Sequence, residues 1–340
     1  MTTLTTLIPA YKKQYLGDVF EGLKHQFFKD FRVILSDDSP NGEITDMLRA
    51  GRFRAQIEHL DLTVVPGPRN ARLNFLWLLE QWGGSTPLVH LHLDDDSILP
   101  DFYEQHVRAH RSGEYSLSVS RRWYAQANGQ VIAGNAPPAF VADSALRVTP
   151  IHAEQLFTSM VPECDNWLGE YTAMVLSADA ARRFPRASRT EMTYFGWPDV
   201  SLLLTAAQQA PIAFVNDHLS VFRQHPAQST HNVKHHGGRV SSMAWAANAL
   251  LAWRHGRVTG NEAVKAIMTT VRACLDAFGE DDEVINRFFT IVQQHGRSLD
   301  ELYNAFEAFW LPLLASHPAT APEGVFPAYR PQLAAEPSYA

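Results

Sequence analysis

Short apolar segments alternate with amphipathic segments through the first hundred residues of this 340-residue chain. The apolar segments have the length of strands and cover residues 4–10, 31–36, 62–65 and 88–93. Between them, apolar residues recur at helical spacing, as from Tyr15 to Phe27. This alternation predicts βαβ units and a mainly parallel sheet covered by helices. Right-handed crossovers bring the carboxyl ends of such strands to one edge, where ligands are expected to bind.

Polar residues follow several of these predicted strands, and the run Asp94–Asp96 is the most acidic of them. No Lys or Arg stands beside this run in the sequence, so its charge is unfavourable unless a cation is present. Carboxylate oxygens suit Mg²⁺ or Mn²⁺, and such an ion can neutralise a diphosphate. For an isolated Asp run, a solvated turn that caps the following helix is the alternative interpretation.

The middle of the chain is less regular. Asn128-Gly129 indicates a hairpin turn, and Ser177 is a predicted cap of a helix that runs to Phe184. Residues 133–160 are rich in Pro and Ala and are expected to form a loop on the acceptor side. Strands are predicted at residues 116–124, 171–176, 212–215 and 219–222, and a helix at 199–209.

The pattern changes near residue 238. Residues 239–256, 261–277, 283–295 and 299–315 each have helical periodicity, with Asn261 and Ser298 as predicted helix starts. Glu301 follows Ser298 at the spacing of a capping box. The predicted organisation is a catalytic domain over 1–237, divided into a nucleotide-binding half (1–115) and an acceptor half (116–237). A helical appendage (238–315) and a loosely packed tail (316–340) follow.

Composition excludes several classes of protein. The net charge of −7 gives no overall basic field for nucleic acid. Cys164 and Cys274 do not have the spacing of a zinc site. The N-terminus lacks a signal-peptide pattern, and the longest apolar run, 244–253, is too short to span a bilayer. We therefore expect a cytoplasmic protein. Peripheral contact with the inner face of a membrane and a homodimer both stay open.

Four segments resemble, in order and spacing, the motifs of the family 2 glycosyltransferases of the GT-A fold. They are TTLIPAY (residues 5–11), FRVILSDDS (31–39), DDD (94–96) with Pro100-Asp101 beyond it, and LSVFRQHP (219–226). The resemblance covers about residues 1–230. It implies an α/β fold with a GT-A-type nucleotide-binding domain, to which the helical appendage is added.

The resemblance also implies roles in binding a nucleotide-sugar donor. Pro9, Ala10 and Tyr11 would line the base pocket, and Asp38 would accept a hydrogen bond from the base with Asp37 beside it. Arg69 or Arg72 would approach the base or the diphosphate. Asp94 would contact the ribose, and Asp96 and His225 would hold the implied metal ion, Mn²⁺ or Mg²⁺. Asp95 could take either role. A polar loop with His231, His235 and His236 would close over the donor.

An inverting transfer needs a base that takes the proton of the acceptor hydroxyl. The family supplies an acidic pair that opens a helix, and the matching segment here is FGWPDV (195–200), in which Pro198 replaces the first acid. Asp199 is therefore the predicted base. A helix cap is its alternative role, the helix dipole is expected to lower its pKa, and Glu191 is the second choice. Further residues expected on the acceptor side are Trp123, Tyr124, Trp167, Glu170 and Trp197.

The predicted function is the transfer of a sugar from a nucleotide-diphosphate donor to a glycan, lipid-linked or protein acceptor. The alternative is a catalytically degenerate GT-A domain that serves as a sugar-nucleotide-binding or scaffold module. Three other nucleotide-binding or hydrolytic classes are disfavoured by missing motifs. The sequence lacks G-x-G-x-x-G after the first strand, the P-loop motif, and the G-x-S-x-G of α/β-hydrolases.

Overall fold

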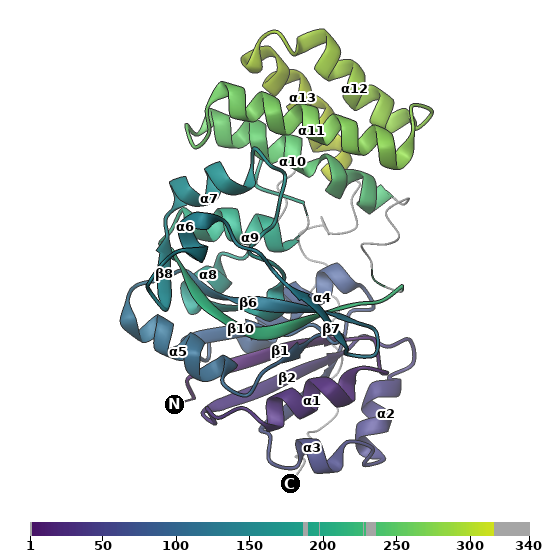
Figure 1. Ribbon diagram of the computed structural model, residues 1–340. Helices are drawn as coiled ribbons and strands as arrows, with labels where there is room; N and C mark the ends of the chain where they lie inside the picture. Colours follow the sequence, from purple (N-terminus) through teal and green to yellow (C-terminus); the bar gives the residue numbers. More distant parts are fainter. Residues whose placement is uncertain (1, 186–189, 197, 227, 229–235, 316–340) are drawn as a thin grey trace.

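The computed structural model describes residues 2–185, 190–196, 198–226, 228 and 236–315 (Figure 1). The predicted tail, Trp197, His231 and His235 lie outside the described residues. A mixed sheet with helices on its faces forms the larger part of the molecule, and four long helices near the C-terminus pack at one end of it (Figure 1). This arrangement confirms the predicted α/β fold with C-terminal helices.

Within the described residues, ten strands form one sheet in the order β3-β2-β1-β4-β9-β6-β10-β5, with β7 on β6 and β8 on β10. The strands β3, β2, β1 and β4 are parallel to one another, as predicted, whereas β9 pairs with both β4 and β6 in antiparallel orientation. The strands are β1 (Leu4–Ala10), β2 (Phe31–Asp37), β3 (Leu62–Pro66), β4 (Leu88–Leu91), β5 (Ser97–Ile98), β6 (Leu117–Gln126), β7 (Val131–Gly134), β8 (Val148–Ile151), β9 (Met174–Ser177) and β10 (Ile212–Gln224).

The register of the parallel strands aligns their polar ends. Ala10 pairs with Asp37, and Asp37 pairs with Pro66, so β1, β2 and β3 end at the same level. The residues that follow these strands therefore lie side by side, as expected for a ligand-binding edge.

Helices cover the sheet because their apolar residues face it. In α1, buried Leu16, Val19, Phe20 and Leu23 recur at helical spacing. The helices before the C-terminal group are α1 (Leu16–Lys24), α2 (Glu43–Arg49), α3 (Arg54–Ile57), α4 (Ala71–Trp82), α5 (Phe102–Ser112), α6 (Ala139–Ala142), α7 (Ala153–Met160), α8 (Ala178–Arg182) and α9 (Pro198–Ala207).

Three local predictions were wrong. Residues 133–160 are not a loop but contain β7, α6, β8 and α7. The two strands predicted at 212–215 and 219–222 are one strand, β10. This strand continues through the polar residues between them because it keeps pairing with β6, with register shifts around His218. Tyr171–Ala173 is a 3₁₀ turn, and the strand β9 begins only at Met174. The hairpin at Asn128-Gly129 is confirmed by the pairing of β6 with β7.

The C-terminal helices are α10 (His236–Arg254), α11 (Gly260–Phe278), α12 (Glu283–His295) and α13 (Leu299–Ala315). α11 starts after Thr259 rather than at Asn261, because Thr259 and Glu262 form a capping box. The Ser298 hydroxyl accepts from the Glu301 N–H, as predicted. The division of the chain at residue 237 stays a prediction, since one apolar core continues from the sheet into these helices.

α10 also supports the segment that precedes Asp199. The Asn248 side chain accepts from the Phe195 N–H at 3.0 Å and donates to the Phe195 carbonyl at 2.8 Å. Gly196 has a φ of +133°, and a Cβ there would lie 2.7 Å from the Ala244 Cβ. The helices thus fix the entry into α9. None of the helices in the described residues is both long enough and apolar enough to cross a membrane.

Candidate active site

A cavity of about 390 Å³ lies at the shared edge of β1 and β2. Tyr11, Asp38, Pro40, Arg69 and Ala71 line it, and Tyr11 is 59% exposed. A volume of this size is in the range of small-ligand sites. The structure therefore brings together three of the residues predicted to contact a nucleotide. Pro9 and Ala10 are the last two residues of the adjacent strand, β1.

The turn after β2 gives its two carboxylates different tasks. Asp37 accepts hydrogen bonds from the N–H and hydroxyl groups of both Ser39 and Thr45. Although burial opposes its charge, these bonds hold the pKa of Asp37 below its usual range. Asp37 therefore stabilises the turn, and Asp38 is the member of the pair that lines the cavity.

The cavity wall next to Asp38 includes a backbone segment with a positive φ. The Arg69 N–H donates to Asp38 Oδ1 at 2.5 Å, and Arg69 has a φ of +58°. A Cβ at Gly67 would lie 2.6 Å from the same oxygen, so only glycine fits there. Burial raises the pKa of Asp38. Arg72 lies in α4, and its side chain is outside the described part of the structure.

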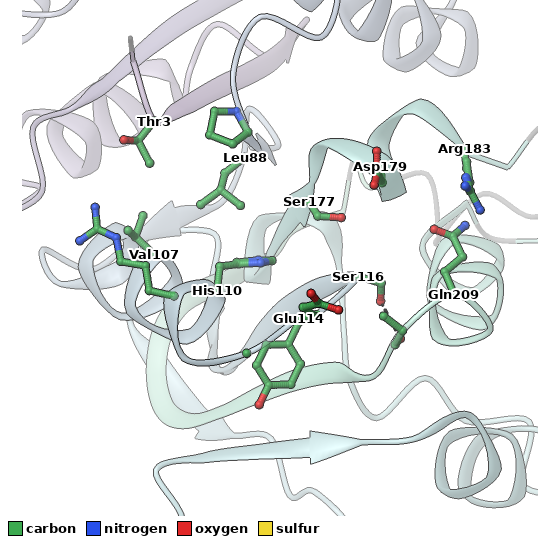
Figure 2. A pocket seen from close by; sticks show the side chains of 15 residues that line it. Thr3, Leu88, Val107, His110, Glu114, Ser116, Ser177, Asp179, Arg183 and Gln209 are labelled. Atoms are coloured by element: carbon green, nitrogen blue, oxygen red, sulfur yellow. Dashed lines mark hydrogen bonds between the residues drawn. The ribbon is translucent and has the colours of Figure 1, made fainter.

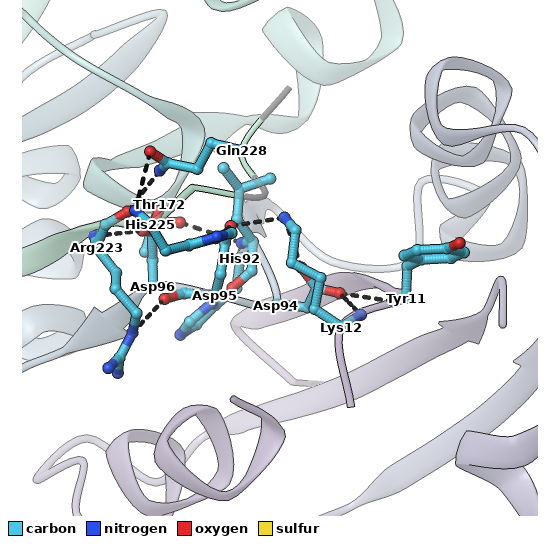
Figure 3. A network of polar contacts seen from close by, with 11 residues as sticks. Tyr11, Lys12, His92, Asp94, Asp95, Asp96, Thr172, Arg223, His225 and Gln228 are labelled. Atoms are coloured by element: carbon cyan, nitrogen blue, oxygen red, sulfur yellow. Dashed lines mark hydrogen bonds and ion pairs between the residues drawn. The ribbon is translucent and has the colours of Figure 1, made fainter. Parts of the chain in front are cut away.

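The acidic run follows β4, and each of its first two side chains bonds to the end of β1 (Figure 3). Asp94 Oδ2 accepts from the N–H groups of Tyr11 (2.6 Å) and Lys12 (2.5 Å). Asp95 Oδ2 lies 2.6 Å from Lys12 Nζ and 2.9 Å from His225 Nε2. Burial raises the pKa of Asp94, whereas Lys12 and His225 outweigh burial and lower the pKa of Asp95.

Asp96 is the most deeply buried member of the run, at 1% exposure. Its Oδ1 accepts from the Arg223 N–H at 3.0 Å, and the Thr172 side chain also favours its charged form, while no described donor lies in good hydrogen-bond geometry to its Oδ2. Burial and the charges of Asp95 and Glu170 raise its pKa well above the usual range. A buried carboxylate oxygen without a partner is unfavourable, so Asp96 Oδ2 is the oxygen best suited to a further ligand.

No Lys or Arg stands beside the acidic run in the sequence, but the fold brings two cations of the chain to it. Lys12 contacts Asp95, and Arg223 donates from Nε to the Asp95 carbonyl at 2.9 Å. Arg223 also donates to the Ala127 carbonyl and to Asp18, and it stacks on Tyr15. The chain's own cations therefore offset part of the charge that was expected to need a metal ion.

His225 was predicted to be a metal ligand. The structure places its Nε2 on Asp95 rather than on Asp96, with its ring 5.1 Å from that of Tyr15. Among the described residues, no three or more His, Cys, Asp or Glu side chains are grouped so that they alone hold a metal ion. The donor's phosphates are one source of further ligands, because Mg²⁺ commonly takes oxygen ligands from substrate phosphates.

Asp199 lies in the first turn of α9, one residue after the helix begins. Its Oδ2 accepts from Asn166 Nδ2 at 2.9 Å and its Oδ1 from the Val200 N–H at 3.0 Å. Burial, followed by the charge of Glu170, raises the pKa of Asp199 to about 7. The helix dipole was expected to lower the pKa of Asp199, but burial and the like charge of Glu170 outweigh that effect.

Glu170 connects the two groups of acids electrostatically, since its charge raises the pKa of both Asp96 and Asp199. Arg122 Nε lies 2.8 Å from Glu170 Oε2, and Arg122 also donates to the Leu168 carbonyl and the Tyr124 hydroxyl. A Cβ at Gly169, where φ is +112°, would lie 2.4 Å from Arg122 Nη1, so glycine is required there.

Other residues predicted for the acceptor side are more dispersed. The Trp167 carbonyl accepts from Arg122, whereas Trp123 stacks on His218 at 3.9 Å. Glu191, the second choice for the base, is exposed, and its charge acts on Tyr303 of α13. These contacts favour Asp199 over Glu191 as the base.

A larger cavity of about 710 Å³ lies elsewhere on the molecule (Figure 2). Thr3, Leu88, His110, Ser177 and Gln209 are among its lining residues, which puts it near the amino ends of β1 and β4. None of the described residues that line it is a predicted site residue. Volume alone therefore does not identify the active site, because the acidic run Asp94–Asp96 follows the other end of β4 and lies outside this cavity.

The sequence matches no family model and no curated protein. The fold matches residues 1–349 of S. aureus TarS in complex with UDP, with a TM-score of 0.55, 12% identity, and coverage of 92% of this chain and 89% of that chain. The complex of the same TarS fragment with UDP-GlcNAc gives a TM-score of 0.51 at 12% identity, with 92% and 91% covered.

A mannosyltransferase from Pyrobaculum calidifontis, in complex with GDP-Man and Mn²⁺, gives a TM-score of 0.48 at 12% identity, with 92% of this chain and 85% of that chain covered. A likeness at that level supports no inference about this chain. The likeness to TarS, at 12% identity, shows the fold alone. The chain thus has the predicted GT-A-like α/β fold.

Proposed function

Since the chain has a GT-A-like fold, we propose that it is a glycosyltransferase that uses a nucleoside diphosphate sugar. One observation supports this best. The edge that carries the Tyr11–Asp38 cavity also carries the acidic turn, and the charge of Glu170 connects that turn to a carboxylate with a pKa of about 7. A nucleotide pocket, a diphosphate-binding region and a base are the three elements that sugar transfer needs.

In this proposal the nucleotide base enters the cavity between Tyr11 and Asp38. Tyr11 offers an exposed aromatic face, and Asp38, which accepts from the N–H groups of Arg69 and Asn70, lines the same cavity. Arg69 or Arg72 meets the base or the diphosphate. Asp94 holds the backbone of Tyr11 and Lys12 and thereby sets the ribose side of the pocket.

We further propose that a divalent cation assists the reaction. The residues fit a shared site, in which Asp96 Oδ2 supplies one buried oxygen and the donor's diphosphate supplies others. Asp95 and His225 would support that site as a bonded pair. When bound, Mn²⁺ or Mg²⁺ would neutralise charge on the leaving diphosphate.

For the chemical step we propose inversion with Asp199 as the base. The acceptor hydroxyl oxygen forms a bond to the anomeric carbon while the bond from that carbon to the phosphate oxygen breaks. Asp199 takes the hydroxyl proton, and Asn166 holds the carboxylate in place. A pKa of about 7 suits this task, because a base with such a pKa is substantially ionised near neutral pH and still binds a proton well.

The acceptor in this proposal is a hydroxyl of a glycan, a lipid-linked glycan or a protein, reached on the cytoplasmic side and, for a lipid-linked acceptor, in peripheral contact with the membrane. Arg122 connects Glu170 to Tyr124, and the charges of Glu170 and Arg122 act on Asp199, so this polar group is the one that such a hydroxyl would meet.

The proposal is tested by thermal shift with nucleoside diphosphates and nucleotide sugars, each with Mn²⁺ and with chelator, followed by an assay of donor consumption. Uridine nucleotides are the first probes. We expect at least one nucleotide to raise the Tm, since ligands that bind only the folded state stabilise it. Binding without any transfer or hydrolysis would favour the degenerate binding module, and no binding across the panel would reject both functions.

A further inference from the structure

Lys12 is the cation that lies between solvent and the acidic turn, Asp94–Asp96. Its Nζ lies 2.6 Å from Asp95 Oδ2 and 3.6 Å from Asp94 Oδ1. A quarter of its side chain is exposed (25%), whereas the side chains of Asp94 and Asp95 are 6% and 7% exposed. A ligand that approaches these two carboxylates from solvent therefore meets the Lys12 ammonium.

The backbone at Lys12 is fixed next to the nucleotide cavity. Its N–H and that of Tyr11 both donate to Asp94 Oδ2, while the Tyr11 side chain lines the cavity. The ammonium therefore belongs to the residue that directly follows the cavity wall (Figure 3). A nucleotide whose base contacts Tyr11 would carry its phosphates within reach of this side chain.

Arg223, the other cation of the cluster, is much less available to a ligand. Its guanidinium donates to the Asp95 carbonyl, the Ala127 carbonyl and Asp18, and the residue is 5% exposed. Lys12 instead has a flexible stem and an ammonium with three donors, which can hold a carboxylate and a phosphate at the same time. The two cations therefore differ in role: Arg223 braces the turn, and Lys12 faces outward.

We propose that Lys12 is a phosphate-binding residue of the donor site, whose ammonium bridges Asp95 and the diphosphate of a bound nucleotide. This inference rests on the proposed function and adds a cation that the chain itself supplies. It implies that a nucleoside diphosphate binds even without a divalent ion, more weakly than with one. It also implies that removal of the Lys12 charge makes binding depend more strongly on the divalent ion.

The test is isothermal titration of UDP and GDP, with uridine and guanosine as phosphate-free controls, in Mn²⁺ and in chelator. The variants are Lys12→Met, Lys12→Arg and the matched control Lys29→Met, an exposed lysine whose Nζ donates to the Lys24 carbonyl. In chelator, Lys12→Met should weaken binding of the diphosphate by about 10- to 100-fold, the effect of one charge-assisted contact. Lys12→Arg and Lys29→Met should bind within a few-fold of wild type, and nucleoside binding should not change.

Equal affinity of wild type and Lys12→Met in chelator would overturn the inference, as would tighter binding by the variant, which would show that Lys12 blocks the site. Lys12→Gln keeps a hydrogen-bond donor for Asp95 and repeats the test if Lys12→Met does not fold. If wild type binds neither diphosphate in either condition, the proposed function fails and this inference fails with it. If only the inference about Lys12 is wrong, the wild type still binds the diphosphate, so the two failures are distinguishable.

Discussion

The two groups of acids at the active edge differ in how their charges are matched. Asp94, Asp95 and Asp96 each have a hydrogen bond or ion pair with the chain, through the side chains of Lys12 and His225, the N–H groups that follow β1, and an N–H of β10. Asp199 has a neutral amide, Asn166, as its side-chain donor, and the nearby Glu170 repels its charge. Arg122, the cation of that region, is 2.8 Å from Glu170.

This difference indicates a division of labour. The donors around Asp94–Asp96 fix the shape of that run and lower the pKa of Asp95, although burial raises the pKa of Asp94 and Asp96; this arrangement suits the binding of a nucleotide and an ion. Asp199 has a neutral amide as its side-chain donor and a pKa of about 7, so it exchanges a proton near neutral pH, which suits catalysis. Replacing single carboxylates in each group should therefore produce different kinetic signatures.

The largest expected effect is that of Asp199→Asn. The substitution preserves the shape of the side chain but removes the basic oxygen, so kcat should fall by about 10²–10⁴-fold while donor affinity stays near wild type. Steady-state kinetics and donor titration measure the two quantities. Glu191→Gln, an exposed carboxylate near α13, is the matched control and should retain activity. Wild-type turnover in Asp199→Asn would eliminate it as the base, and retention of anomeric configuration in the product would reject inversion.

Asp96→Asn should act mainly on binding. The loss of one buried charged oxygen should weaken binding of the diphosphate with Mn²⁺ by about 10- to 100-fold, and the difference between Mn²⁺ and chelator should shrink. Calorimetric titration of UDP in the two conditions is the measurement. Asp101→Asn serves as the control, because this nearby carboxylate makes no capping bond in α5. Affinity that responds neither to chelator nor to the Asp96 substitution would show the metal assignment to be wrong.

The smallest effect should be a shift of the pH profile in Glu170→Gln. The base works deprotonated, so kcat/KM of wild type should fall as pH decreases through about 7, the pKa of Asp199. The charge of Glu170 raises that pKa, and its removal should move the acid limb to lower pH. A pH profile of kcat/KM for both proteins tests this. An unchanged or upward-shifted limb would contradict the coupling of Glu170 to Asp199.

Several parts of the site were predictable from the sequence because they are local. Asp38 and Tyr11 directly follow strands, and parallel strands that end at one level bring such residues together. The acidic run Asp94–Asp96 was predictable for the same reason, because it follows a strand, β4. Asp37 shows the limit of this reasoning, because its bonds to Ser39 and Thr45 give it a bracing task that the motif alone does not distinguish.

The residues that the sequence did not reveal act across long distances in the chain. Lys12 meets Asp95 across 83 positions, and Arg223 meets the Asp95 carbonyl across 128. Glu170 was visible only as a residue on the acceptor side, and its pairing with Arg122 required β6 and the segment before the 3₁₀ turn Tyr171–Ala173 to lie together. No spacing rule predicts such pairs, since each depends on how separate elements pack.

By itself, the sequence determined the α/β alternation, the polar strand ends and the switch to helices near residue 238. Periodicity and strand-end chemistry are local properties, and they survive in any fold that buries the same apolar faces. Only the tertiary structure decided which acids are braced and which one has a pKa of about 7. Those properties depend on burial and on charges that the fold brings close from distant segments, as it brings Glu170 close to Asp199. Neither burial nor such proximity follows from the order of residues alone.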